Sequence, residues 1–229
     1  MATMLINKER GLYEAVDLNP DEIWRTWEVV GRHEETADVL SFVVKRTDPR
    51  PTKASLPGQY VSLKKEMPDG VHQLRQYSLT KADDGDHRHF AVKRVSGLNG
   101  APDGEMSNLL HSSLQVGDRV QLSAPFGDVV LNYSNRPVVL ASAGIGITPM
   151  AGMLSHLAKD GASRKVHVLH ADGSPESFAL RQQVEASLEK LPGARLDVWF
   201  EKPGETPAAN EHSGYMNLDD IELADDAEY

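Results

Sequence analysis

The sequence contains no cysteine, which excludes a disulfide framework, a zinc–thiolate site and a cysteine nucleophile. Long apolar runs are also missing, since no stretch approaches the roughly 18 consecutive apolar residues of a membrane-spanning helix. The start of the chain, MATMLINKERGLYEAV, lacks the apolar core of a secretory signal. Cytoplasm is therefore the expected compartment.

Basic residues are scarce relative to acidic ones. The 24 Lys and Arg residues stand against 34 Asp and Glu, and the net charge of −10 argues against nucleic acid or an anionic membrane surface as a partner. The nine histidines show no HExxH or other paired metal spacing, and the acidic segment DDIELADDAEY lacks the order of a calcium loop. We predict no metal site and interpret these residues as structural or solvated.

What is present suffices for two domains, because 40% of the 229 residues are hydrophobic and 25% are charged. Residues 1–22 are expected to form a short helix and a linker, since Leu5, Leu12 and Val16 recur at helical spacing and Pro20 follows. Over residues 23–134, short alternating runs such as VLSFVVKR, separated by turn residues, predict an antiparallel β-barrel. One helix over about residues 106–112 interrupts these strands.

Residues 135–229 have the pattern of a parallel α/β domain. PVVLASA is a continuous apolar strand, and KVHVLHA and RLDVWFE are two more strands. A helix is expected in TPMAGMLSHLAKDG, with Thr148 as its N-cap and Gly161 at its end. A second helix is expected over SPESFALRQQVEASLEKLPG. This β-α-β-α-β order implies parallel strands with right-handed crossovers.

Two short stretches carry candidate chemistry. In HQLRQYSLT, Arg75 and Tyr77 share one face of a strand, where a guanidinium can hold a phosphate and a ring can lie against a flat aromatic ligand. The plainer alternative is a surface strand with an incidental charge. In ASAGIGITPM, a strand runs into two glycines and then a helix, which is an arrangement that binds a pyrophosphate. The alternative there is a tight turn that simply needs glycine, and the pattern is not the Rossmann G-x-G-x-x-G, because Pro149 takes the sixth position.

The two stretches in this order resemble the ferredoxin-reductase-type flavoproteins, which pair an FAD-binding barrel with an NAD(P)-binding domain. RQYSLT, AVKR, MSNLLH and SAGIGITPM are most similar to the reductase half of flavohaemoglobins, the nitric oxide dioxygenases. The opening LINKERGLYEAV is similar to the last helix of the globin domain that precedes this reductase.

The resemblance implies a role for each matching residue. It implies that FAD is bound by Tyr60, Arg75, Gln76, Tyr77 and Ser78, with Arg75 on the pyrophosphate. Tyr77 and Ser78 are implied as the catalytic pair, packing on the isoalloxazine and hydrogen-bonding near flavin N5. The start of the barrel helix is implied to bind the FAD phosphates through Gly104, Met106 and Ser107. The NAD(P)H pyrophosphate is implied to lie on Gly144, Ile145, Gly146, Ile147, Thr148 and Pro149. Flavin and nicotinamide supply the hydride chemistry, and the protein supplies positioning and electrostatics.

The sequence departs from the family pattern in three places. No globin domain is present, so haem would belong to a domain that this chain lacks. The family's Cys-Gly-Pro strand and terminal segment are missing after Tyr229, so we expect an incomplete cofactor domain with an exposed apolar sheet edge. The connection SGLNGAPDGEMS is longer than usual.

We predict an FAD-dependent NAD(P)H oxidoreductase that passes electrons to a globin domain or a similar acceptor. Asp172, after the second parallel strand, would favour a ribose hydroxyl over a 2′-phosphate, which points to NADH, although a loop aspartate without a ligand role fits as well. Nearby His170 is interpreted as a packed histidine. Two alternatives remain at this point: an FAD-binding module with little hydride transfer, and the reductase component of a multicomponent oxygenase.

Overall fold

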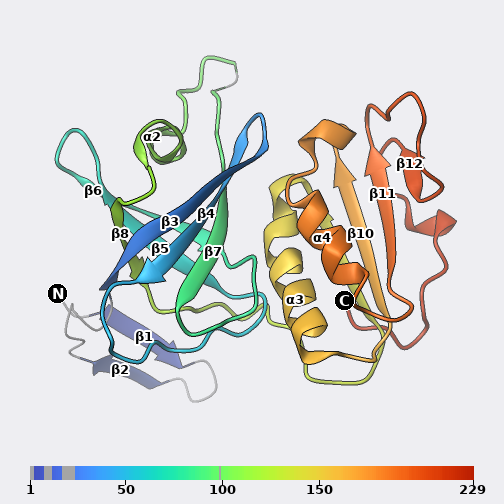
Figure 1. Cartoon of the computed structure of the whole chain (residues 1–229), viewed down its shortest axis with the longest axis horizontal. Coiled ribbons are helices and arrows are strands. Elements are labelled where there is room, and N and C mark those ends of the chain that lie inside the picture. Colours follow the sequence, from blue (N-terminus) through green and yellow to red (C-terminus); the bar gives the residue numbers. More distant parts are fainter. Residues whose placement is uncertain (1–2, 8–11, 17–23, 98) are drawn as a thin grey trace.

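The structure is a computed structural model that describes residues 3–7, 12–16, 24–97 and 99–229. Figure 1 shows two units side by side, an antiparallel sheet curled into a barrel and a parallel sheet with helices packed on it. The predicted fold class is therefore confirmed. Helix α3 (Ile147–Asp160) lies on the side of the parallel sheet that faces the barrel.

The barrel sheet has six antiparallel strands in the order β6-β5-β8-β3-β4-β7. Its strands are β3 (Trp24–Thr36), β4 (Val39–Arg46), β5 (Tyr60–Glu66), β6 (His72–Ser78), β7 (His87–Lys93) and β8 (Arg119–Ser123). An antiparallel bridge between Leu79 and Phe90 joins the end of β6 to β7, so the two outer strands of the sheet meet. Alternating apolar residues turn inward and form a core in which Phe42, Phe90 and Leu63 are fully buried.

Helix α2 (Glu105–Ser113) covers one end of the barrel and confirms the helix expected over 106–112. Its Met106 and Leu110, together with Leu114 just beyond it, are buried in the barrel core. The start of α2 is thereby fixed relative to the strands, which matters because this start is a predicted phosphate site.

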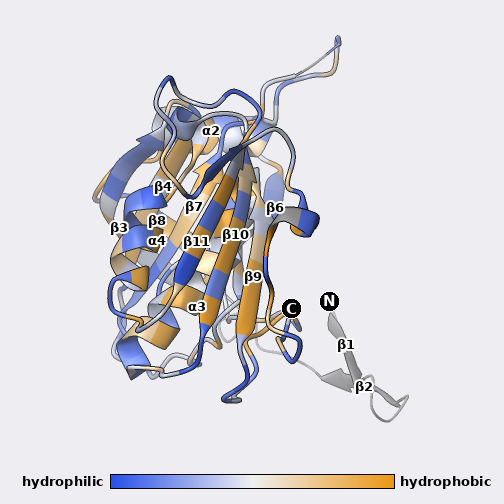
Figure 2. Cartoon of the chain, turned by 90° about the vertical axis from the view of Figure 1, so that its right-hand side faces the viewer, coloured by the Kyte–Doolittle hydropathy of each residue, from blue (hydrophilic) through white to orange (hydrophobic). Residues whose placement is uncertain are grey.

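The second sheet is parallel, with the order β12-β11-β10-β9. Its strands are β9 (Val138–Ala143), β10 (Val166–Asp172), β11 (Arg195–Phe200) and the short β12 (Glu211–Ser213), which the sequence did not predict. Figure 2 shows β9 as a largely hydrophobic strand, whereas hydrophobic and hydrophilic bands alternate along β10 and β11. One face packs on α3 and α4 (Arg181–Leu188), and the other is covered by Met216, Ile221 and Leu223 of the C-terminal segment. Both faces are thus covered, as the unbroken apolar pattern of β9 indicates.

The short helix predicted within residues 1–22 is wrong for the part of this segment that the structure describes. β1 (Thr3–Asn7) and β2 (Leu12–Val16) form an antiparallel hairpin instead. Thr3, Ile6, Tyr13 and Val16 are residue types that favour paired strands. Residues 1–2, 8–11 and 17–23, including Pro20, lie outside the described residues.

The second predicted helix is shorter than expected. Ser174 and Ser177 bond reciprocally around a separate 3-10 turn, Pro175–Ser177. Leu180 then takes a left-handed conformation with φ of 60°, so α4 begins only at Arg181. Between the two, Phe178 is buried in the core of the α/β domain, and its packing outweighs the helical periodicity that runs through the segment.

The two units meet along α3 and α4. Gly152 of α3 lies so close to the barrel that a Cβ atom there would stand 2.2 Å from the carbonyl oxygen of Leu79. The backbone N–H of Ala82 donates to Ser155 Oγ at 3.1 Å, and Lys159 Nζ donates to the carbonyl of Asp83 at 2.6 Å. Gln183 of α4 hydrogen-bonds the carbonyl of Thr80. We call residues 79–83 with these partners the seam.

Candidate active site

A cleft of about 750 Å³ lies between the two units, and both sequence motifs line it. Gln76, Tyr77 and Ser78 come from the end of β6. Ile145, Gly146, Thr148 and Pro149 come from the glycine loop and the first turn of α3. Two stretches far apart in the sequence therefore face one another across one hollow.

Tyr77 is the aromatic side chain among the described residues that line the cleft. Its ring stacks on Phe90 with centroids 5.5 Å apart and planes inclined by 25°. Burial raises the pKa of the Tyr77 phenol to about 12, outweighing the opposite effect of Arg75, so the phenol is neutral at physiological pH. A rigid, neutral ring at a cleft wall suits contact with another flat ring.

Tyr60 and Arg75 lie beside the cleft and not among its lining residues. The Tyr60 ring packs edge-on against Phe126, and its hydroxyl accepts a hydrogen bond from Gln76 Nε2 at 3.3 Å. Arg75 is exposed and donates to the carbonyl of Leu74 at 2.8 Å and to Gln73 Oε1 at 3.1 Å. Gln73 in turn hydrogen-bonds Glu105 in the first turn of α2. Arg75 is thus directed along the barrel towards α2, and its predicted phosphate role remains a prediction.

The start of α2 offers backbone groups more than side chains. A Cβ atom at Gly104 would meet Val95 Cβ at 2.7 Å, so close packing requires glycine there. Met106 is only 1% exposed and belongs to the barrel core. The Ser107 hydroxyl accepts from the N–H of Val95 at 3.1 Å and donates to the carbonyl of Gly104 at 3.0 Å. The backbone N–H groups of this first turn have no partner within the helix and are the donors available to a phosphate.

The glycine loop has open space above it. Gly144 has φ of 49°, a left-handed conformation that favours glycine, and a Cβ atom there would meet nothing within 4 Å. At Gly146 the nearest atom to such a Cβ would be Ser142 Cβ at 3.9 Å. Backbone geometry therefore explains Gly144, whereas neither packing nor a positive φ explains Gly146. Open space over backbone N–H groups at a helix start is what a pyrophosphate needs.

The other loop residues fix the loop in place. Ile147 is fully buried, and Ile145 packs against Val39 and Ala91 of the barrel and Ala179 of the α/β domain. Thr148 is not the N-cap that the sequence suggested, because Gly146 holds that position and Thr148 Oγ1 donates to the carbonyl of Ile145 at 2.9 Å. Gly161 does end α3, in a left-handed conformation.

Asp172 has a local role in the structure. Its Oδ1 accepts from the N–H of Gly173 at 2.7 Å and from Ser177 Oγ at 2.6 Å, and its Oδ2 lies 3.4 Å from Nε2 of buried His170. Burial acts to raise the pKa of Asp172, but these hydrogen bonds together lower it. The Asp172 side chain is 6% exposed. It stabilises the turn after β10 through these hydrogen bonds, and little of its carboxylate is accessible to a ribose hydroxyl.

Comparison with known proteins extends this picture. The family of oxidoreductase FAD-binding domains matches residues 20–131, and the family of oxidoreductase NAD-binding domains matches residues 140–227. A solved structure, the flavohaem-like FAD/NAD-binding domain of nitric oxide dioxygenase from Vibrio cholerae O1 biovar El Tor, is 34% identical with a TM-score of 0.80. The alignment covers 89% of this chain and 84% of that one. The chain belongs to the ferredoxin-reductase-type flavoproteins and corresponds to the reductase part of flavohaemoglobins.

Curated relatives of this reductase are longer proteins. A flavohaemoprotein of Chromobacterium violaceum is 37% identical over 100% of this chain and 59% of its own length. One of Deinococcus radiodurans is 35% identical over 96% of this chain and 55% of its own length. The chain thus spans little more than half of these relatives. Within the residues that the structure describes, no helix is both long enough and apolar enough to span a membrane.

Sequence reasoning missed part of the lining of the cleft. Lys93 and Arg94 line it from the end of β7, and Asp38 lies 3.4 Å from Lys93 Nζ. Only the AVKR stretch pointed to them, through the resemblance. Their charge suits a cleft that would receive anionic cofactors.

Proposed function

We propose that this chain passes a hydride from NADH or NADPH to FAD and then electrons to a haem-globin or a similar acceptor, as the reductase of a nitric oxide dioxygenase-type system. The observation that carries the proposal is the single cleft lined by Tyr77 and Ser78 on one wall and by the glycine loop on the other. The family membership supports FAD and a nicotinamide dinucleotide as the two cofactors.

The barrel residues and the glycine loop would each bind a different cofactor. Tyr77 and Ser78 would hold the flat ring of the flavin against the barrel, with Tyr60, Gln76, Arg75 and the start of α2 binding the rest of FAD. The glycine loop from Gly144 to Pro149 would hold the pyrophosphate of the second nucleotide. Since the seam fixes α3 against the barrel, the loop at its start faces Tyr77 without a large domain movement. NADH remains the predicted donor, because HADGSPES, which spans the end of β10 and the turn after it, contains no arginine or lysine for a 2′-phosphate.

The test is an anaerobic mixing experiment. FAD-loaded protein is mixed with excess NADH, and the long-wavelength absorbance of the flavin is followed. Rapid bleaching supports the reductase. A stable yellow protein that only dithionite bleaches would instead show an FAD-binding module without hydride transfer, and a protein that binds no FAD would refute the proposal. Reoxidation by a separately supplied globin domain, compared with an oxygenase component, distinguishes the two kinds of acceptor. A cytoplasmic location remains a prediction.

A further inference from the structure

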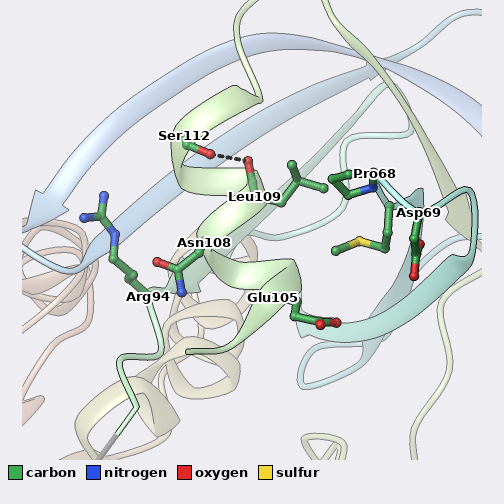
Figure 3. Close-up of a pocket in the computed structure, with 8 residues that line it drawn as sticks. Pro68, Asp69, Arg94, Glu105, Asn108, Leu109 and Ser112 are labelled. Carbon is green, nitrogen blue, oxygen red and sulfur yellow. Dashed lines mark hydrogen bonds between the residues drawn. The ribbon is translucent and has the colours of Figure 1, made fainter. Parts of the chain in front are cut away.

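A hollow of about 590 Å³ over the outer side of α2 adjoins the cleft between the domains. Arg94 belongs to the lining of both. In Figure 3 the Arg94 side chain lies on one side of α2, and Pro68 and Asp69 lie on the other. Because the two linings share a side chain, the hollow over α2 belongs to the site already described.

A second hollow, of about 370 Å³, lies at the opposite end of the parallel strands from the glycine loop. Its lining includes the first residues of β9, β10 and β11, which are Val138, Val166 and Arg195, whereas the glycine loop follows the end of β9. Leu223 and Ala227 of the C-terminal segment also line this hollow. Figure 2 shows the C-terminus beside β9. A hollow of this volume falls within the range of small-ligand pockets, about 300–1,000 Å³.

Three basic side chains line the second hollow. Lys165, just before β10, and His167, within it, are two residues apart and therefore share one face of the sheet. Arg195 is the register partner of His167 on β11. Lys165 and Arg195 are exposed, and neither side chain has a hydrogen bond or ion pair with a residue that the structure describes. Glu222 is the single acid of the lining and likewise has no such partner among the described residues. Positive charge is therefore in excess around this hollow.

His167 is held by one ring nitrogen and leaves the other unused. Its Nε2 lies 2.7 Å from Asp197 Oδ2, and Nε2 of His212 lies 2.8 Å from Asp197 Oδ1. Burial acts to raise the pKa of Asp197, but its hydrogen bonds to His212 and His167 together lower it, so the carboxylate only accepts. Both Nε2 atoms therefore donate. Nδ1 of His167, a residue that is 9% exposed, has no hydrogen-bond partner in the part of the chain that the structure describes. In the protonated ring, this atom would donate to an anion in the hollow.

We propose that the second hollow binds a small organic carboxylate. Its charged group lies among Lys165, His167 and Arg195, since a guanidinium fork matches the two oxygens of a carboxylate. Its apolar body lies on Val139 and Leu223, which an inorganic anion would leave uncovered. The inference goes beyond the proposed function and does not depend on it, because this hollow and the glycine loop lie at opposite ends of the strands.

The experiment is a titration of the whole chain with benzoate, followed by ligand-detected NMR. Benzoate should bind at least about 10-fold more tightly than benzamide, which has the ring without the charge, and than acetate, which has the charge without the ring. Arg195→Gln should weaken benzoate binding about 10-fold, the lower end of the range for a hydrogen bond to a charged group, because the guanidinium is exposed. Glu222→Gln should strengthen it about 2- to 5-fold, since a repulsive charge is removed. Arg119→Gln, at an exposed position on β8, is the matched control and should bind benzoate like the wild type.

Four results would overturn the inference. Benzoate may fail to bind, or it may bind no better than benzamide. Arg195→Gln may bind benzoate as tightly as the wild type does. Inorganic phosphate binding as tightly as benzoate would show a plain anion site, and displacement of benzoate by NADH would place benzoate in the cofactor cleft. A wild-type protein that binds benzoate as expected but binds no flavin would refute the proposed function alone.

Discussion

Replacing Gly152 by alanine tests how the seam sets the distance between the two cofactor motifs. The added Cβ atom would stand 2.2 Å from the carbonyl oxygen of Leu79, whereas such contacts under 3.0 Å essentially do not occur in proteins. The helix and the barrel must therefore separate by about 0.8 Å, the difference between these two distances. Overpacking of this kind lowers the stability of the fold by about 1–3 kcal/mol. Alanine is a better helix former than glycine, which offsets about 0.8–1 kcal/mol of this loss. We expect a net destabilisation between about 0 and 2 kcal/mol.

The larger effect is expected on hydride transfer. A misplacement of about 1 Å can lower a rate about 100-fold, and the glycine loop at the start of α3 moves with the helix. FAD affinity should not change, since the flavin-binding residues lie on the barrel. Stopped-flow reduction by NADH measures the rate, and a thermal melt should show a decrease in Tm of at most about 8 °C. Gly204→Ala is the control, because its Cβ would have Pro175 Cγ at 3.8 Å as its nearest neighbour. If Gly152→Ala is reduced as fast as the wild type, the seam does not set the geometry of the cleft.

Three further changes have defined outcomes. Arg75→Ala should weaken FAD binding by about 1.5–3 kcal/mol, and an unchanged affinity in flavin titration would make Arg75 an incidental surface charge. Burial, aided by the charge of Lys81, lowers the pKa of His89 to about 4. Because the unfolded chain binds this proton near pH 6.5, the free energy of unfolding should fall as the pH drops from about 6.5 to about 4. Urea titrations of His89→Gln should show a smaller fall over the same pH range. Arg88 is 3% exposed and forms an ion pair with Asp83 at 3.0 Å. Asp83→Asn should therefore lower the free energy of unfolding by about 3–5 kcal/mol, because it leaves a buried cation without its counter-charge. Denaturation midpoints of Asp83→Asn equal to those of the wild type would show that the pair is screened by solvent.

Periodicity predicted the elements whose own residues decide their structure. The unbroken apolar run of β9 and the alternation in β4 predicted the correct strands, because each strand buries the faces that its pattern indicates. The helix expected from residue 174 was too long, because the bonds between Ser174 and Ser177 and the burial of Phe178 depend on tertiary contacts. β12 was missed for the same reason, since a strand of three residues is defined by its neighbour and not by its own sequence.

The residues of the candidate site likewise fall into those that the local sequence indicates and those that only tertiary contacts bring together. Tyr77 and the glycine loop could be singled out as candidates because ring and phosphate binding require recognisable residue types in short stretches, and the structure brings both to one cleft, whereas Arg75 lies outside its lining and its phosphate role remains a prediction. Neither motif indicated that Arg94 adjoins a hollow over α2, because Met67, Pro68 and Leu109 are ordinary apolar residues that come together only in the folded barrel. For Asp172 the sequence left a ligand role and a plain loop role open, and its hydrogen bonds to Gly173 and Ser177 favour the loop role.

The stretch RQYSLTKADDG serves both domains at once. Tyr77 and Ser78 line the cleft, and the next residues, Leu79 to Asp83, contact α3 and α4. The residues that form the barrel wall of the cleft and the residues that hold α3 in place are therefore adjacent in one backbone segment. This adjacency limits how far Tyr77 and the glycine loop at the start of α3 can move apart. Substitutions in this segment should then divide by position: changes at residues 75–78 should lower flavin affinity, and changes at the seam should lower the rate of reduction by NADH while flavin affinity is kept. A seam variant that loses FAD in proportion to its loss of rate would contradict this division.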